Sequence, residues 1–168
     1  MAIPGIPVDP RSQVYKRICD QLRTDPVIGS RVEWICWDGA RKDVIAVATD
    51  KPTVETSVKS EGQTWAAPDA FRGMLGVEII LHIPNSYDAT DGLDLWGAIE
   101  RALYPKNKRD KQLAFEQQLR DAGAETGEIE LSQPAAITPV PTDDGSGFAA
   151  AFVGRGAIRL PILRATNP

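Results

Sequence analysis

The chain has 168 residues, of which 42% are hydrophobic and 25% charged, values typical of one soluble globular domain. Its 19 basic and 23 acidic residues give a formal net charge of −4, which disfavours a protein that mainly binds the outside of a nucleic acid. Cys19 and Cys36 each stand in an apolar stretch without a second thiol nearby, so we expect buried free thiols in a reducing compartment. No signal-peptide pattern and no membrane-length apolar run occurs, so we expect a soluble intracellular protein.

The first helix is predicted at about residues 10–24. Asp9 is a suitable N-cap and Pro10 fits the first helical position. Apolar residues then recur at every fourth position from Val14 to Leu22, which gives the helix one apolar face.

Two further helices are predicted later in the chain, at about residues 91–104 and 108–122. The acidic run Asp88–Asp94 before the second helix lacks carboxylates at the calcium-loop positions, so we interpret it as helix capping. The third helix is strongly charged, and Gly123 is placed to cap its end.

Six segments are rich in strand formers and bounded by turn residues. The expected strands are residues 31–37, 44–49, 53–59, 74–83, 125–133 and 148–163. The segment 74–83 is the clearest, because Val77, Ile79, Leu81 and Ile83 alternate with Gly76, Glu78, Ile80 and His82.

This order of elements predicts an α+β fold, with a mixed or antiparallel sheet packed by two or three helices in a single domain over residues 1–168. Within that domain we expect an N-terminal arm at residues 1–9, an additional charged helix at 106–123 and a loop at 134–147.

Chemistry-bearing motifs are scarce. His82 is the only histidine, and no nucleophile elbow, phosphate loop or metal-ligand spacing accompanies it. We therefore expect no catalytic residue, no cofactor and no metal, and a protein that is not an enzyme. The alternative from another class is a small hydrolase or ligand-binding domain built around His82 and nearby acids.

Charge is segregated along the chain. Residues 101–120 hold six basic and two acidic residues, residues 121–130 hold four acids and no base, and residues 145–168 hold three arginines and no acid. These blocks are either solvated faces or complementary patches that join one copy of the chain to the next. The side chains assigned to such pairing are Arg155 and Arg159 against Glu125, Glu128 and Glu130.

Two large aromatic residues, Trp65 and Phe71, fall in residues 60–73, which we expect to form a loop. Because this loop has no periodicity that would bury them, they either tuck under the domain or anchor a protein interface. We predict that Trp65, Phe71 and the neighbouring Arg72 belong to an inter-subunit or tube-facing contact.

Four segments together carry a family resemblance. They are the opening helix and its continuation Val14–Ile28, the long strand Gly76–Pro84, the helix Leu95–Leu103 and the ending Gly147–Ile162, which is similar to a pair of closing strands. On these segments the chain resembles the tail terminator, or tail completion, proteins of long-tailed bacteriophages. The charged helix at 108–122 is longer than in a minimal member of that family.

The resemblance implies a mixed sheet packed by helices and assembled as a hexameric ring. Such a ring binds the last ring of the tail tube, halts tube polymerisation and offers a surface to the head or neck. It implies no catalytic residue and no cofactor. The implied partners are further copies of the chain, the tail tube protein and neck or head–tail connector proteins.

The same resemblance implies a virion tail or neck location, assembly in the bacterial host cytoplasm and no membrane partner. DNA would only pass through the lumen, and the net negative charge suits that passage because it repels phosphates. A head–tail connector or stopper protein is the alternative within the virion class.

Overall fold

The computed structural model describes residues 4–6, 8–29, 32–35, 51–67, 70–84, 86–104, 109–132, 138–141 and 148–165. Within these residues the chain forms three helices and six strands. The helices are α1 (Pro10–Thr24), α3 (Ala89–Leu103) and α4 (Arg109–Asp121). The strands are β1 (Glu33–Ile35), β2 (Thr53–Ala67), β3 (Ala70–Pro84), β4 (Glu130–Ser132), β5 (Thr138–Pro141) and β6 (Phe148–Ala165).

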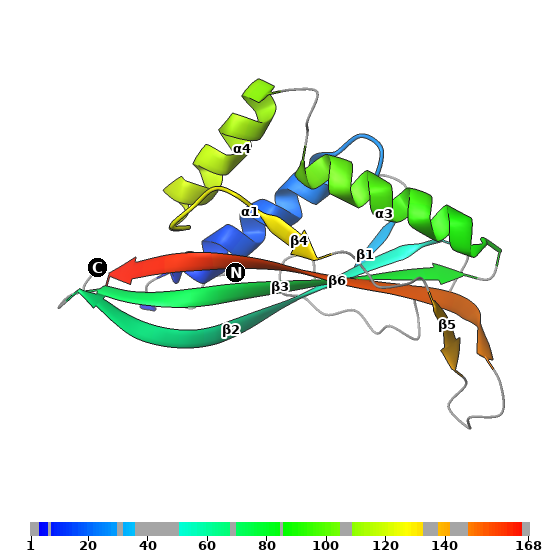
Figure 1. The fold of residues 1–168 in the computed structure, drawn as a ribbon, viewed down its shortest axis with the longest axis horizontal. Helices are drawn as coiled ribbons and strands as arrows, with labels where there is room; N and C mark the ends of the chain where they lie inside the picture. Colours follow the sequence, from blue (N-terminus) through cyan, green and yellow to red (C-terminus); the bar gives the residue numbers. More distant parts are fainter. Residues whose placement is uncertain are drawn as a thin grey trace.

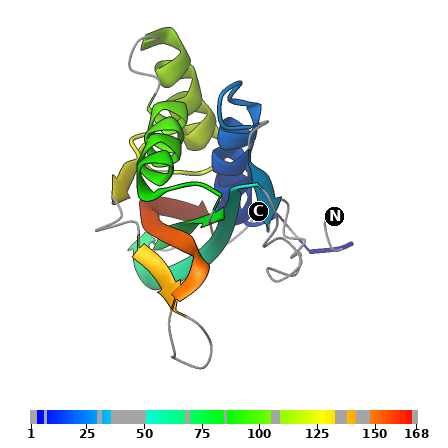
Figure 2. The ribbon, with the colours of Figure 1, turned by 90° about the vertical axis from the view of Figure 1, so that its right-hand side faces the viewer.

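One mixed sheet joins all six strands, in the order β1-β2-β3-β6-β4, and β5 pairs with another part of β6. The β1–β2 pair is parallel and the other pairs are antiparallel. Three long strands, β2, β3 and β6, make up most of the sheet, and all three helices lie on one side of it (Figure 1, Figure 2). The predicted α+β class is therefore confirmed.

The core lies between the sheet and the helices. The inward residues of β3 are fully buried because alternate side chains of a strand point to the same face. They pack with one apolar stripe of α1 and one of α3 in a single cluster. The largest fully buried side chains of this cluster are Ile18, Leu22, Ile28, Leu75, Ile79, Leu81, Ile83, Ile99, Leu103, Leu119 and Ile158.

Local sequence explains the helix ends. Asp9 accepts the N–H of Arg11 before α1, with Pro10 at the first helical position. Asp88 and Asp91 form a reciprocal capping box at the start of α3, which confirms capping as the role of these acids. Gly123 follows α4 with φ +112°, a conformation that favours glycine.

The predicted loop at 60–73 is wrong. β2 continues to Ala67 and β3 begins at Ala70, so the two strands form one long hairpin. Trp65 and Phe71 are direct cross-strand partners in this hairpin. The polar and glycine-rich sequence here does not alternate, and pairing with the neighbouring strands imposes the extended conformation instead.

Three further expectations need correction. The ending is not a pair of strands, because β6 runs without interruption from Phe148 to Ala165. The expected loop at 134–147 contains β5, which pairs with β6. The expected strand at 125–133 is reduced to β4, because the preceding segment packs against α4 at Gly127. The expected strand at 44–49 and Cys36 lie outside the described residues.

Candidate assembly surface

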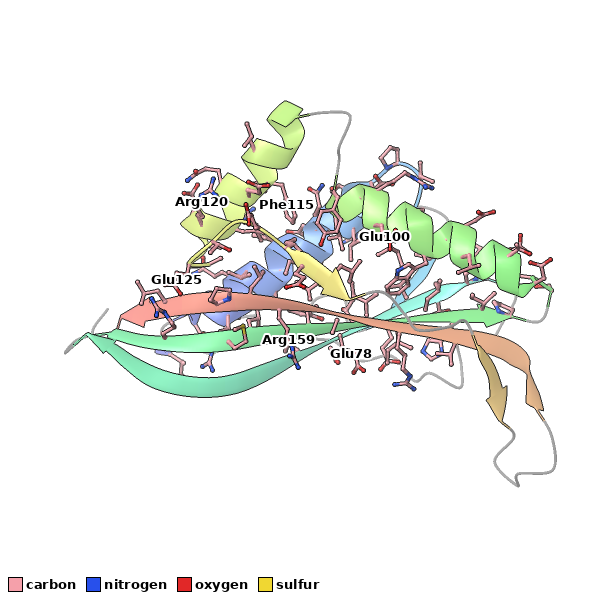
Figure 3. All side chains as sticks on the ribbon, viewed as in Figure 1. Glu78, Glu100, Phe115, Arg120, Glu125 and Arg159 are labelled. Atoms are coloured by element: carbon pink, nitrogen blue, oxygen red, sulfur yellow. The ribbon has the colours of Figure 1, made fainter. Side chains whose placement is uncertain are left out.

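The side of the sheet that faces away from α1 and α3 carries the charged strand residues, and we call it the outer face. Antiparallel partners point to the same side of a sheet, so the register defines this face. Figure 3 shows Glu78 and Arg159 projecting from it, on the side opposite the helices. Among the described side chains, its charged members are Glu55 on β2, Arg72, Glu78 and His82 on β3, Arg155 and Arg159 on β6, and Glu130 on β4.

His82 is held by an acid from the neighbouring strand. Its Nε2 lies 3.1 Å from Oε2 of Glu55, and both side chains are half-buried. Thr53 is the direct cross-strand partner of His82, but it is only 2% exposed and its hydroxyl has no hydrogen-bond partner among the described residues. The threonine hydroxyl therefore offers no open nucleophile to the His82–Glu55 pair.

A second charge pair lies beside the first. Nη1 of Arg155 is 3.9 Å from Oε1 of Glu78, and the Ser57 hydroxyl donates to the other carboxylate oxygen of Glu78 at 3.4 Å. Arg155 is 62% exposed, so most of its guanidinium stays open to solvent and to other molecules.

Arg72 and Glu125 form an ion pair at the hairpin end of the outer face. Glu125 reaches that position because Ala124 bridges to Ile162 and the Glu125 N–H donates to the carbonyl of Pro161. The pair thus joins the segment after α4 to β3 across β6.

Arg159 and Glu130 are cross-strand partners of β6 and β4 in the same chain. Tyr104 sets the position of this acid: its hydroxyl donates to the Ile129 carbonyl at 2.5 Å and accepts from the Leu131 N–H at 2.7 Å. Burial raises the pKa of the Tyr104 hydroxyl, and the Leu131 N–H partly offsets the effect.

The segment before β4 packs tightly against α4. A Cβ at Gly127 would lie 2.5 Å from the carbonyl oxygen of Glu116, so only glycine fits there without movement. The next residue, Glu128, is exposed. A cleft of about 230 Å³ lies here, bordered by Tyr104, Phe115 and Glu128.

The predicted interface residues therefore come together only in part. Arg72, Arg155 and Arg159 share the outer face, and Glu125 and Glu130 lie beside two of these arginines within one chain. Glu128 lies apart, at the α4 cleft. Trp65 and Phe71 pair near the tip of the hairpin, in a part of β2 and β3 where only the backbone is described.

Sequence reasoning missed Glu55, Glu78 and Tyr104. The alternation of residues in β3 predicts from sequence that Glu78 and His82 lie on one face of the strand. Glu55 meets His82 because of the β2–β3 register, and Tyr104 meets β4 because of where that strand packs. No sequence pattern near either residue indicates these contacts.

Among the residues that the structure describes, no group of three or more histidine, cysteine or acidic side chains is placed to hold a metal ion. In the same residues, no helix is long and apolar enough to cross a membrane. Burial raises the pKa of Cys19 to about 11, which disfavours the reactive thiolate form of that thiol.

No protein-family model matches the chain, and no curated protein matches it.

Proposed function

We propose that the protein is a tail terminator of a long-tailed bacteriophage. In this role its copies form a ring, hexameric by the resemblance, that caps the tail tube, stops its polymerisation and presents a surface to the head or neck. The resemblance of four sequence segments to that family motivates the proposal.

The observation that carries the proposal is the outer face. It spans three long strands, none of the described helices covers it, and it combines exposed Arg155 with exposed apolar Leu163. Interface cores are enriched in arginine, and mixed polar and apolar faces suit contacts between folded proteins. A subunit that works through assembly needs such a surface.

The test combines mass measurement with tube capping. The purified protein is studied by native mass spectrometry and light scattering, and is then added to the tail tube protein from the same genome during tube polymerisation. We expect a closed ring, tubes that stop growing, and the protein at tube ends in electron micrographs.

Two outcomes would contradict the proposal. One is a strict monomer at high concentration and low salt that also leaves tube length unchanged. The other is a ring that binds the head–tail connector but never the tube end, which would identify the connector or stopper alternative.

A further inference from the structure

An apolar groove lies between α3, the turn after α1 and the start of β2. We call it the α3 groove; its volume is about 450 Å³. Pro52 and Ala98 are buried in it, Tyr87 and Leu95 are half-buried, and Val27 is exposed on its wall. This size falls in the range of roughly 300–1,000 Å³ that is usual for ligand clefts.

The charges around the α3 groove balance. Lys51 and Arg101 supply two positive charges, and Asp91 and Asp94 supply two negative ones. A groove with an apolar floor and no net charge at its rim suits an uncharged, apolar occupant better than an ion or an acidic peptide.

The chain itself carries a segment of that chemistry. Residues 1–8, Met-Ala-Ile-Pro-Gly-Ile-Pro-Val, contain no charged and no hydrogen-bonding side chain. Among the described residues of this arm, Ile6 is 59% exposed and Val8 is 52% exposed. Two large aliphatic side chains so near each other are left without burial by their own chain.

Proline makes this arm suitable for groove binding. Pro4 and Pro7 have no N–H, so this segment leaves fewer backbone donors to satisfy on binding. Proline-rich extended segments commonly dock in aromatic-lined grooves, and Tyr87 supplies an aromatic ring here.

Val8 cannot reach the groove of its own chain. α1 has 15 residues and is about 22 Å long, with the arm at its start and Val27 just beyond its end. Val8 stands two residues before α1, and the chain extends by at most about 7 Å over two residues.

We infer that the arm of one copy docks in the α3 groove of a neighbouring copy, with Ile6 and Val8 as its anchors. The contact joins two different surfaces, so it repeats head to tail and closes into a ring when the rotation permits. The inference rests on the proposed ring function and names one contact that would build the ring.

Disulfide trapping tests the contact. In a Cys36→Ser background, the double variant Val8→Cys/Val27→Cys is oxidised alone and on tail tubes. Two cysteines bridge only when their Cα atoms are within about 7 Å, so the pair cannot close within one chain. We expect a ladder of covalent oligomers on a non-reducing gel.

The matched control is Val8→Cys/Val58→Cys, because Val58 on β2 is 50% exposed, as Val27 is 52% exposed. We expect no ladder from it. Three results would overturn the inference. They are equal ladders from both variants, only uncrosslinked monomer from Val8→Cys/Val27→Cys, or a disulfide formed within one chain of that variant.

A second variant, Ile6→Asp/Val8→Asp, changes only exposed side chains, so the subunit should keep its fold, which circular dichroism checks. We expect self-association to weaken about tenfold or more, with Val58→Asp unchanged. Rings and tube capping that survive the arm variant overturn this inference alone. A wild-type protein that neither assembles nor binds tube ends overturns the proposed function instead.

Discussion

Tyr104 is a residue whose single hydroxyl holds two backbone groups at once. By donating to Ile129 and accepting from Leu131, it fixes the short strand β4 against the end of α3. Three ladder pairs alone hold β4 to β6, so this side chain supplies a substantial part of the strand's attachment.

Tyr104→Phe should therefore lower the free energy of unfolding by about 1–3 kcal/mol, because two backbone groups lose their partner. Urea denaturation measures the change. Tyr87→Phe is the control, since no hydrogen bond of the Tyr87 hydroxyl is found in the described part of the chain. Equal effects of the two substitutions would contradict the role of Tyr104.

Gly123 is required by both its conformation and its surroundings. Its φ is +112°, and a Cβ there would lie 2.6 Å from the Cβ of Pro10 at the start of α1. Gly123→Ala should cost about 1–3 kcal/mol of stability. Gly97→Ala, within α3, would meet only the flexible end of Arg101 at 3.3 Å and should gain about 0.5–1 kcal/mol. Thermal unfolding of both variants tests these opposite effects on stability. A loss of stability in Gly97→Ala would contradict the prediction.

For single residues, the sequence predicted helix-capping roles better than contacts between distant parts of the chain. Asp9, Asp88 and Gly123 act on their immediate chain neighbours, so their roles follow from local order. The Arg72–Glu125 pair depends on where the segment after α4 meets β6, which no local pattern records.

Among the elements, α3 depends most visibly on its first turn. Asp88 accepts from the N–H groups of Thr90 and Asp91, and hydrogen bonds, first that of the Thr90 hydroxyl, lower the pKa of its carboxyl. A carboxyl with a lowered folded-state pKa stabilises the fold above its unfolded pKa, and this contribution is lost as the pH falls through the folded value.

Asp88→Ala should consequently lower the unfolding midpoint at pH 7, and the gap from wild type should shrink below about pH 3.8, the ordinary value for this carboxyl. Asp94→Ala, an exposed acid beyond the capping box, is the control and should have a smaller effect. A gap that is the same at pH 3 and pH 7 would contradict the cap mechanism.

The β2–β3 hairpin is the element that sequence patterns described least well. The helices were predicted within about two residues because caps and periodicity mark them locally. Residues 60–73 carry no such signal, and their extended form comes from pairing β2 with β3 and β3 with β6. Strand pairing between segments that are far apart in the sequence could therefore not be predicted from local patterns.

If the hairpin meets another subunit or the tube, Trp65→Ala should reduce tube capping while the isolated subunit keeps its secondary structure. Large aromatic anchors commonly dominate interface energetics, so a loss of at least about tenfold in apparent affinity is expected. A tube-length assay measures it, with Val58→Ala on the same strand as the control. Capping equal to that of the parent would end the proposed role of Trp65.

At the scale of the whole molecule, most of the charged residues assigned to partner subunits have neighbours of opposite charge within one chain. The pairs are Arg72 with Glu125, Arg155 with Glu78 and Arg159 with Glu130. Exposed pairs of this kind contribute only about 0–1 kcal/mol to folding, so they remain available to exchange partners on assembly. Arg155 is 62% exposed and Glu128 is also exposed, so both are open to another copy.

Arg155→Glu should leave the unfolding midpoint nearly unchanged and weaken ring formation, and adding Glu128→Arg should restore it if the two meet across subunits. Native mass spectrometry at low and high salt measures the ring fraction, and salt should weaken the wild-type contact. A double variant that assembles no better than Arg155→Glu would reject this pairing.

The partnership of β3 with β6 also constrains the order of folding. The ladder pairs Ala70 with Ala165 at one end and Pro84 with Ala151 at the other, so β3 gains this neighbour only after β6 has been synthesised. Such distant pairing raises contact order and slows folding, whereas the β2–β3 hairpin is local. On the ribosome, one edge of β3 therefore stays unpaired until β6 has been synthesised. Truncation within β6 should leave an aggregation-prone chain rather than a smaller folded subunit.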